Sequence, residues 1–390
     1  MSATAKIHFW GLNALRFFAA YCVVLHHGET IRHKLGLPNF HDYSFFQNGT
    51  LAVSFFFVLS GFLITYLLLS EIERTNDVSL RKFYLRRILR IFPLYYLLVF
   101  IGLILIPTLL SLINYPNTQP YDTLTGGVLF LFFLSFVVNA AFGSHLLEPL
   151  WSIGVEEYFY IIWAPLFKKF KGKNHQNLLI VIISTIVIKS FLILFFHFFS
   201  SENHAFSILK EVILSLKFEL MAIGGLGAYA VFKNRNAVEK AFVFTPFFQI
   251  VLFALLIIRF FFNNYCVDNQ GIIGTFYRGI VFTPVLNIFT EGSLFLWLLL
   301  NVSVNPKAFF KLRNPILNKL GEMSYGIYMY QMLVIFAVVL TFKKIMLKMD
   351  PSVSSVFFYV LVTIGVISVS FLSKKYFEDW FLRLKRRFDV

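Results

Sequence analysis

One apolar stretch of this chain contains residue types that move protons and hold anions. The stretch LRFFAAYCVVLHHGE, residues 15–29, carries Arg16 near its start and His26 and His27 near its end. A histidine can take a proton from a hydroxyl group near neutral pH, and an arginine can hold a carboxylate or a phosphate. Such groups are costly inside a bilayer, so they usually face the protein interior and mark a site.

Helical geometry separates the two histidines of this stretch. At about 100° per residue, the eleven steps from Arg16 to His27 end ~20° past three full turns and ~16 Å further along the axis. His26 points ~80° away from Arg16. The spacing therefore predicts that His27, rather than His26, lines an interior groove together with Arg16. The alternative is that both histidines only reach toward the outer membrane interface.

A second candidate segment runs from Trp151 to Tyr160 and contains Glu156 and Glu157. Adjacent residues point ~100° apart on a helix, so one glutamate can contact His27 or a substrate while the other pairs with a basic group. A carboxylate beside a histidine fixes its tautomer and raises its basicity. Both glutamates are candidates for this role, and Glu156 is favoured by position only. The alternative is an aromatic belt at the interface with two solvated glutamates.

The densest cationic patch is RKFYLRRILR, residues 81–90, which we interpret as part of a cytoplasmic loop. Arg86 and Arg90 are four residues apart and Arg87 and Arg90 are three apart, so each pair forms neighbours on a helix. Guanidinium groups bind phosphates through paired hydrogen bonds, which suits a phosphorylated ligand. Spacing alone favours the alternative, an ordinary anchor on anionic lipid headgroups.

Two further features complete the candidate residues. Glu219 is an ionisable group in an apolar segment, one turn before glycines that let helices approach closely, and we expect it to contact substrate. The histidines have no spacing typical of metal ligands, and the chain has neither a P-loop nor an HExxH motif. We therefore expect no metal.

These candidates lie in a chain with the composition of a membrane protein. Of its 390 residues 58% are hydrophobic, and the mean hydropathy is +0.73. Many apolar runs reach the ~20 residues that cross a bilayer. We expect an all-α polytopic transmembrane helical bundle, about ten spanning helices in a single membrane domain over residues 1–390, with no appended soluble domain. Because the basic residues behind the net charge of +15 lie between apolar runs, they favour a lipid bilayer over nucleic acid as partner.

The positions of the basic residues give the predicted topology. The ten predicted spans are residues 12–28, 50–70, 91–113, 150–167, 177–199, 210–232, 243–262, 279–301, 322–342 and 353–376. Basic segments between them place both chain ends in the cytoplasm. Only one net crossing then fits between residues 114 and 168, although two apolar stretches lie there. We expect residues 127–142 to be re-entrant or packed inside the protein, and residues 150–167 to cross.

In order along nearly the whole chain, several segments resemble the acyltransferase 3 family of integral-membrane O-acyltransferases. The matching stretches are LNALRFFAAYCVVLHH, SFFFVLSGFLIT, FYLRRILRIFPLYY, LEPLWSIGVEEYFYIIW, FELMAIGGLGA and LGEMSYGIYMYQ. The family's first helix carries an arginine, ten intervening residues and a histidine, which selects His27 as the geometry does. The last stretch departs from the family's SYxxYxxH-like pattern, because Gln331 stands where a histidine often does. We assign Gln331 no role in proton transfer.

The resemblance implies a multi-pass enzyme of the inner (cytoplasmic) membrane. Such an enzyme transfers an acyl group, acetyl by default, from cytoplasmic acyl-CoA to a hydroxyl group of an extracytoplasmic or lipid-linked glycan. Succinyl or a longer acyl group is the alternative to acetyl. The sequence indicates no particular acceptor and no oligomeric state.

The candidate residues fit this reaction in stated roles. Arg86, Arg87 and Arg90 are expected to hold the phosphates of coenzyme A, and Arg16 to steer the donor. His27 is expected to act as general base on the acceptor hydroxyl or as a transient acyl carrier. Glu156 or Glu157 is expected to orient the histidine or the sugar. Trp151 is a candidate to stack on a sugar ring, although an interfacial anchor explains it as well, and Glu219 is a second candidate contact of the substrate.

A transporter is the other class of protein that fits these features. Ten helices with buried arginine, histidine and glutamate are also typical of a proton-coupled carrier or flippase of a small molecule or glycolipid. The absence of an inverted-repeat signal in the sequence and the cytoplasmic arginine patch favour the acyltransferase.

Overall fold

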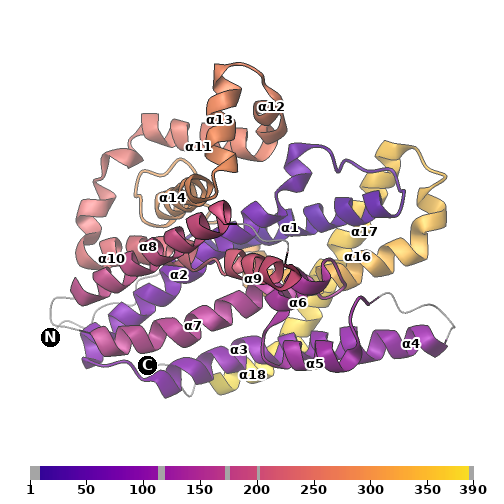
Figure 1. Cartoon of the computed structure of the whole chain (residues 1–390), viewed down its shortest axis with the longest axis horizontal. Coiled ribbons are helices and arrows are strands. Elements are labelled where there is room, and N and C mark those ends of the chain that lie inside the picture. Colours follow the sequence, from indigo (N-terminus) through magenta and orange to yellow (C-terminus); the bar gives the residue numbers. More distant parts are fainter. Residues whose placement is uncertain (1–8, 113–118, 172–175, 200–202, 386–390) are drawn as a thin grey trace.

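The chain is a bundle of α-helices (Figure 1). The computed structural model describes residues 9–112, 119–171, 176–199 and 203–385, and these segments contain no strand. The first half consists of α1 (Leu12–Lys34), η1 (Ser44–Gln47), α2 (Gly49–Thr75), α3 (Leu80–Phe100), the π-helical turn η2 (Ile101–Leu105), α4 (Ile106–Leu112), α5 (Thr123–Leu131), α6 (Ser135–Phe142), α7 (Leu150–Phe170) and α8 (Gln176–Phe198).

The second half continues the bundle and adds a small projection. Its elements are α9 (His204–Ser215), α10 (Phe218–Glu239), η3 (Phe242–Phe244), α11 (Pro246–Phe261), α12 (Asn263–Asp268), α13 (Ile272–Phe282), α14 (Pro284–Ser303), α15 (Pro315–Glu322), α16 (Ser324–Met346), α17 (Pro351–Ser373), the π-helical turn η4 (Lys374–Glu378) and α18 (Asp379–Lys385). Figure 1 shows α12 and α13 standing out from the rest of the bundle.

The prediction of a polytopic helical bundle is confirmed. The predicted spans overlap helices, although residues 210–232 are divided between α9 and α10 and residues 279–301 between α13 and α14. Within the described residues, seven helical segments are long and apolar enough to cross a membrane. The other three predicted spans correspond to α1, α7 and α11. Helix α11 has only 16 residues. Helices α1 and α7 are long enough to cross a membrane, but their mean hydropathy is lower. Their ionisable residues, which include the candidate site residues, lower it.

The basic patch at residues 81–90 belongs to a helix, and its interpretation as a loop is wrong. Helix α3 begins at Leu80, because the Ser79 side chain accepts a hydrogen bond from the Lys82 backbone N–H and caps the first turn. The arginines therefore have fixed directions. The parts of the predicted basic segments at residues 172–173 and 386–390 lie outside the described residues.

The segment expected to be re-entrant is broken into two short helices. Helices α5 and α6 are separated at residues 132–134, where Phe133 has a positive φ of 59°. Tyrosine hydroxyl groups donate hydrogen bonds to carbonyls at the break. Tyr95 donates to the Phe130 carbonyl at 3.1 Å and Tyr96 to the Leu131 carbonyl at 2.8 Å. Non-continuous backbone is tolerated at membrane depth where protein covers it in this way.

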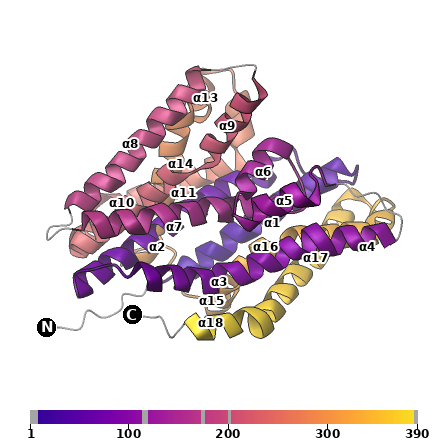
Figure 2. The ribbon, with the colours of Figure 1, turned by 60° about the horizontal axis from the view of Figure 1, so that its bottom comes forward.

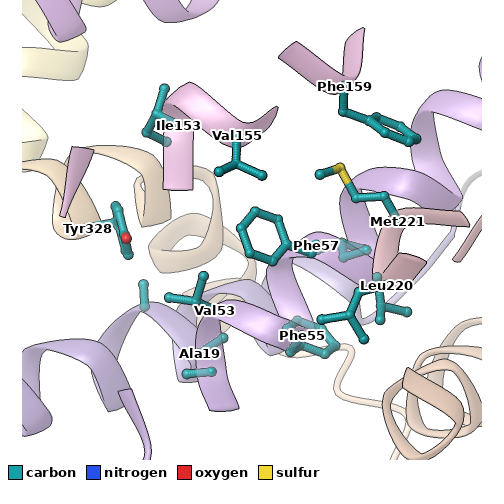
Figure 3. Packing of buried hydrophobic residues seen from close by; sticks show 14 of the residues in the cluster. Ala19, Val53, Phe55, Phe57, Ile153, Val155, Phe159, Leu220, Met221 and Tyr328 are labelled. Carbon is teal, nitrogen blue, oxygen red and sulfur yellow. The ribbon is translucent and has the colours of Figure 1, made fainter. Parts of the chain in front are cut away.

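Helix α2 forms the centre of the bundle. It packs along α10 and also contacts α1, α7 and α14. The two helices approach closely at two glycines that have no Cβ atom. A Cβ atom at Gly61 would collide with the Met221 carbonyl, and one at Gly224 with the Val58 carbonyl. Figure 3 shows side chains of α1, α2, α7, α10 and α16 meeting in this core. Small residues thus set the distance between the two helices. Close packing is important here because apolar side chains gain little free energy when they exchange lipid contacts for protein contacts.

Contacts between distant segments define the two ends of the bundle. At the end where α1 begins, Asn13 donates to Asn318 at 2.8 Å, and Lys374 lies 3.0 Å from Glu322. Figure 2 shows α18 packed beside α3. At the end where α1 finishes, Lys34 donates to Ser144 at 3.1 Å. The start of α1 and the end of the described chain therefore lie on the same side.

A buried ion pair fixes the second half of α1 against α17. Arg32 donates to Glu29 at 2.6 Å and to Ser355 at 2.7 Å, and both charged side chains are fully buried. Tyr359 donates to the same Glu29 oxygen at 2.5 Å, and the guanidinium lies over the Phe358 ring. A charge pair buried this deeply is tolerated because several partners surround it, although Nε of Arg32 has no hydrogen-bond partner among the described residues.

Alanine substitutions at the helix contact test the close approach of α2 and α10. Gly61→Ala or Gly224→Ala forces the two helices apart, and we expect each to destabilise the protein by about 1–3 kcal/mol. The measurement is the thermal unfolding midpoint of the purified protein in detergent.

Gly279→Ala in α13 is the matched control, since no atom lies within 4 Å of the position its Cβ would occupy, apart from its chain neighbours and the nearby backbone of its own helix. Its midpoint should stay unchanged or rise, because alanine favours helix over glycine. An equal fall in all three variants would contradict the role of the α2–α10 contact.

Candidate functional site

Helix α1 carries both Arg16 and His27 and is regular from Leu12 to Lys34. This regularity keeps the two side chains ~16 Å apart along one face. Ala20 and Val23 occupy the same face between them, and both are buried. The two functional candidates are therefore separated by a short apolar layer, and each has its own set of neighbours.

The first set of neighbours, which we call the arginine cluster, consists of Arg16, Arg87, Arg90, Glu156 and Tyr160. The charges that act on Arg16 are those of Arg90, Glu156 and Arg87. The Arg87 guanidinium lies 5.4 Å from the centre of the Tyr160 ring. Tyr160 donates to Glu156 at 2.9 Å and also hydrogen-bonds a serine of α2. The cluster joins α1, α3 and α7 and gathers three cations around one carboxyl group.

The two adjacent glutamates of α7 face different partners, as the helical spacing predicts. Glu156 lies in the arginine cluster, where Tyr160 holds it. Glu157 is buried, one of its oxygens has no hydrogen-bond partner among the described residues, and the positive charge of Arg87 acts on it. Neither glutamate is among the groups that act on His27. The expectation that one of them orients His27 therefore finds no contact here.

The three arginines predicted to act together divide into two groups. Arg86 lies 3.4 Å from Glu71 of α2, whose other oxygen accepts the Ser79 backbone N–H at 2.9 Å. Arg87, one residue on, points ~100° away and joins the arginine cluster with Arg90. The structure therefore brings Arg87 and Arg90 together with Arg16 and assigns Arg86 to a contact that closes the turn between α2 and α3.

The second set of neighbours, which we call the histidine cluster, consists of His27, Gln331, Tyr328 and Ser152. The Nδ1 atom of His27 lies 3.3 Å from Oε1 of Gln331. The Gln331 amide nitrogen donates to the Tyr328 backbone carbonyl at 2.9 Å. The Tyr328 hydroxyl lies 2.8 Å from the Ser152 hydroxyl. This chain of hydrogen bonds joins α1, α16 and the start of α7.

His26 and His27 have different partners. Nδ1 of His26 lies 3.0 Å from the Phe46 carbonyl in η1, and its ring packs against Gly49 at the start of α2. His26 thus holds the connection between α1 and α2, whereas His27 faces α16. The prediction that the two rings face different directions agrees with these contacts.

Sequence reasoning missed Glu148 and Gln331. The charge of Glu148 acts on both His26 and His27, and its carboxylate accepts a hydrogen bond from Ser144 at 2.5 Å. The signal that could have identified it is an acidic residue directly before the helix that carries Glu156. From the sequence, Gln331 is named only as a departure from the family's pattern, with no role in proton transfer, whereas the structure shows that its side chain contacts His27.

The two residues that we expected to contact substrate, Trp151 and Glu219, pack against other parts of the protein. Trp151 is half-buried, with its ring 5.8 Å from that of Phe57 in an edge-to-face arrangement. Glu219 is buried at the start of α10 and lies 3.9 Å from the Lys189 ammonium of α8, which also donates to the Ile213 carbonyl at 2.6 Å. This pair spans the break between α9 and α10. The structure does not bring Glu219 to either cluster.

Two cavities in the described part of the chain do not contain the clusters. One of about 730 Å³ lies between α1, η1 and α17, and one of about 490 Å³ lies beside α11. Arg16 and His27 line neither cavity. Within the described segments, no group of three or more His, Cys, Asp or Glu residues is placed to hold a metal ion.

Comparison with known proteins gives a family and distant relatives. A family model described as an acyltransferase domain matches residues 9–374. The putative peptidoglycan O-acetyltransferase YrhL of Bacillus subtilis is 31% identical over 166 residues, 40% of this chain and 23% of the relative. The peptidoglycan O-acetyltransferase OatA of Listeria monocytogenes is 29% identical over 186 residues, 44% of this chain and 26% of the relative. No solved structure matches the chain.

The O-acetyltransferase OatA of Staphylococcus aureus is a third relative. It is 29% identical over 209 residues, 50% of this chain and 30% of the relative. The chain therefore spans less than a third of the length of each of these curated relatives.

Substitution of the Lys189–Glu219 pair tests whether its role is structural. Glu219→Gln leaves a buried ammonium group without its opposite charge, and Lys189→Met leaves a buried carboxylate. We expect each to cost about 3–5 kcal/mol of stability. The double substitution should recover much of this loss, because neither buried charge remains unpaired. The measurement is the unfolding midpoint in detergent, and single variants as stable as the unmodified protein would show that the pair holds nothing together.

Proposed function

Because the chain belongs to the acyltransferase family whose domain matches residues 9–374, we propose that it moves an acyl group across the membrane interior to a glycan. The donor is a cytoplasmic acyl-CoA, with acetyl-CoA as the first to test, and the acceptor is a hydroxyl group of an extracytoplasmic or lipid-linked glycan. The observation that carries this proposal is the position of two chemically different clusters at two levels of α1.

The arginine cluster is the proposed binding site for the donor. Coenzyme A carries phosphate groups, and guanidinium groups bind phosphates with paired, charge-assisted hydrogen bonds. Arg87 and Arg90 lie in the first half of α3, whose start faces the end of the bundle where Lys168 and Lys171 pair with Asp77. Because basic residues stay in the cytoplasm, that end is the cytoplasmic one in our proposal. Both ends of the chain are then cytoplasmic.

The histidine cluster is the proposed site of chemistry. It lies toward the opposite end of α1, where an extracytoplasmic acceptor arrives. A hydroxyl group is a poor nucleophile until a base removes its proton, and a positioned base contributes about 10²–10⁴-fold to the rate. His27 is the base in this proposal, and formation of a transient acyl-imidazole is its alternative role. Arg16, on the same face, guides the thioester from the donor site toward His27.

The remaining candidates receive supporting roles. Glu156 balances the positive charge of the arginine cluster and, with Tyr160, keeps Arg16 directed toward the donor. Glu157, also on α7, does the same for Arg87 of α3. Trp151 lies one residue before Ser152 of the histidine cluster, so it remains our candidate to contact a sugar. Glu219, held by Lys189, acts on the shape of the bundle instead of on the acceptor.

The relatives indicate which acceptor to test first. Two of them are named peptidoglycan O-acetyltransferases, so peptidoglycan fragments are the first choice among glycans. We propose that the helical bundle over residues 1–390 acts as one domain in this transfer.

Transport is the second candidate function, and one observation favours it. The buried Lys189–Glu219 pair lies at a break between two helices, α9 and α10, and interrupted membrane helices are typical of binding sites in carriers. Purified protein that moves labelled acetyl groups from acetyl-CoA to a glycan acts as the transferase. Flux into vesicles without transfer would favour the carrier.

Substitutions in α1 test the assignment of the base. His27→Ala should lower the rate of acyl transfer by about 10²–10⁴-fold, and Arg16→Ala should lower it strongly because the thioester loses its guide. His26→Ala should keep most of the activity, since that ring holds a loop. Transfer is measured with labelled acetyl-CoA on equal amounts of purified protein. An inactive His26→Ala together with an active His27→Ala would disprove the assignment.

Substitutions on α3 test the donor site. Arg90→Ala removes a cation from the arginine cluster, and we expect the KM for acyl-CoA to rise about tenfold or more, the effect of one charge-assisted hydrogen bond. Lys82→Ala, on the same helix but exposed, is the matched control and should leave KM unchanged. Equal increases in both variants would mean that general positive charge, and not a site, attracts the donor.

A further inference from the structure

The contact between Gln331 and His27 determines which ring nitrogen of His27 carries a proton. Gln331 is fully buried on α16, so its amide group has only protein partners. Its nitrogen donates to the Tyr328 backbone carbonyl at 2.9 Å, and a carbonyl oxygen can only accept. The amide oxygen must therefore be the atom that faces His27.

An amide oxygen also only accepts hydrogen bonds, so the His27 nitrogen that faces it must donate. That nitrogen is Nδ1, 3.3 Å from Oε1 of Gln331. In a neutral imidazole one nitrogen carries the proton and the other has a free lone pair, and the hydrogen bond of the first sets the state of the second. We propose that Gln331 is a positioning residue, which keeps the proton of His27 on Nδ1 so that Nε2 offers its lone pair to the acceptor hydroxyl. This inference rests on the proposed acyl transfer.

The surroundings of His27 give Gln331 a distinct task. The charged and titratable groups that act on His27 are His26 on the same helix, Glu148 before α7 and Lys34 at the end of α1. The positive charge of Lys34 and the negative charge of Glu148 oppose each other. Gln331 is neutral, so it directs the ring without adding charge, whereas a carboxylate at this position would make the ring a much stronger base.

The proposed tautomer gives a balanced transfer step. The O–H bond of the acceptor breaks and its proton passes to Nε2, while the acceptor oxygen forms a bond to the acyl carbonyl carbon. The C–S bond of the thioester then breaks, and the departing coenzyme A sulfur takes the proton from Nε2. The Nδ1 proton stays in its hydrogen bond to Gln331 throughout, so the histidine returns to its starting state.

Three substitutions at position 331 test this role. Gln331→Leu removes the acceptor, and we expect kcat to fall by about tenfold or more while the KM for acyl-CoA stays unchanged, because the arginine cluster is untouched. Gln331→His restores an acceptor nitrogen and should rescue kcat. Gln331→Glu places a negative charge beside the ring, so the acidic limb of the pH–rate profile should move to higher pH by about one unit or more.

Gln249→Leu is the matched control for the loss of a buried glutamine. Gln249 on α11 is also fully buried and bonds only backbone groups, including the Phe244 carbonyl at 2.9 Å and the Phe309 N–H at 3.0 Å. Its variant should lose stability but keep the pH–rate profile of the folded protein. A Gln331→Leu variant with unchanged kcat, or a Gln331→Glu variant with an unshifted profile, would overturn the proposal.

A measurement without activity separates this inference from the proposed function. Nitrogen-15 labelling of the nine histidines, with His27→Ala to assign the His27 signals, reports which ring nitrogen is protonated. We expect the signals of a protonated Nδ1 and a free Nε2, and a mixture of the two tautomers in Gln331→Leu. A proton on Nε2 would overturn the inference even if the protein transfers acyl groups. Absence of transfer with a protonated Nδ1 would overturn the proposed function alone.

Discussion

A charge held among membrane helices needs an opposite charge or hydrogen-bond partners close by, and this constraint determines how the bundle is assembled. Glu29 and Arg32 attach α1 to α17, and Lys189 and Glu219 attach α8 to α10. Arg259 and Glu291 attach α11 to α14 at 2.8 Å, and Ser54 of α2 donates to the same glutamate. In each of these pairs one cation meets one anion.

The arginine cluster differs from these pairs because several charges meet in it. The charges of Arg16, Arg87 and Arg90 act on Glu156, and Arg87 also acts on Glu157. Each pair holds two helices together, whereas this cluster gathers the guanidinium groups that we propose for the phosphates of the donor. The same comparison separates His26, which serves a loop carbonyl, from His27, whose Nε2 has no such commitment in our proposal.

The sequence predicted what depends on local pattern. Apolar runs located the long helices, and helical periodicity gave His26 and His27 different directions. The limited length of residues 127–142 together with charge parity indicated the irregular segment that is now α5 and α6. Contacts between distant segments were not predictable. Gln331 meets His27 across 304 positions of chain, and Glu219 meets Lys189 across a helix break, so neither pairing has a local signal. Arg86 and Arg87 have different partners because both lie on α3, where neighbouring residues point in different directions. The sequence alone places the start of this helix in a loop and so does not predict the difference.

The apolar layer formed by Ala20 and Val23 on α1 has a consequence for the cell. Protons and ions cross a bilayer only along polar groups or water, and these two residues contribute neither to the face between the clusters. In the proposed reaction, coenzyme A enters from one compartment and a sugar from the other. An apolar layer between the two clusters would then keep protons from passing along this face, so that the electrochemical gradient across the membrane is preserved.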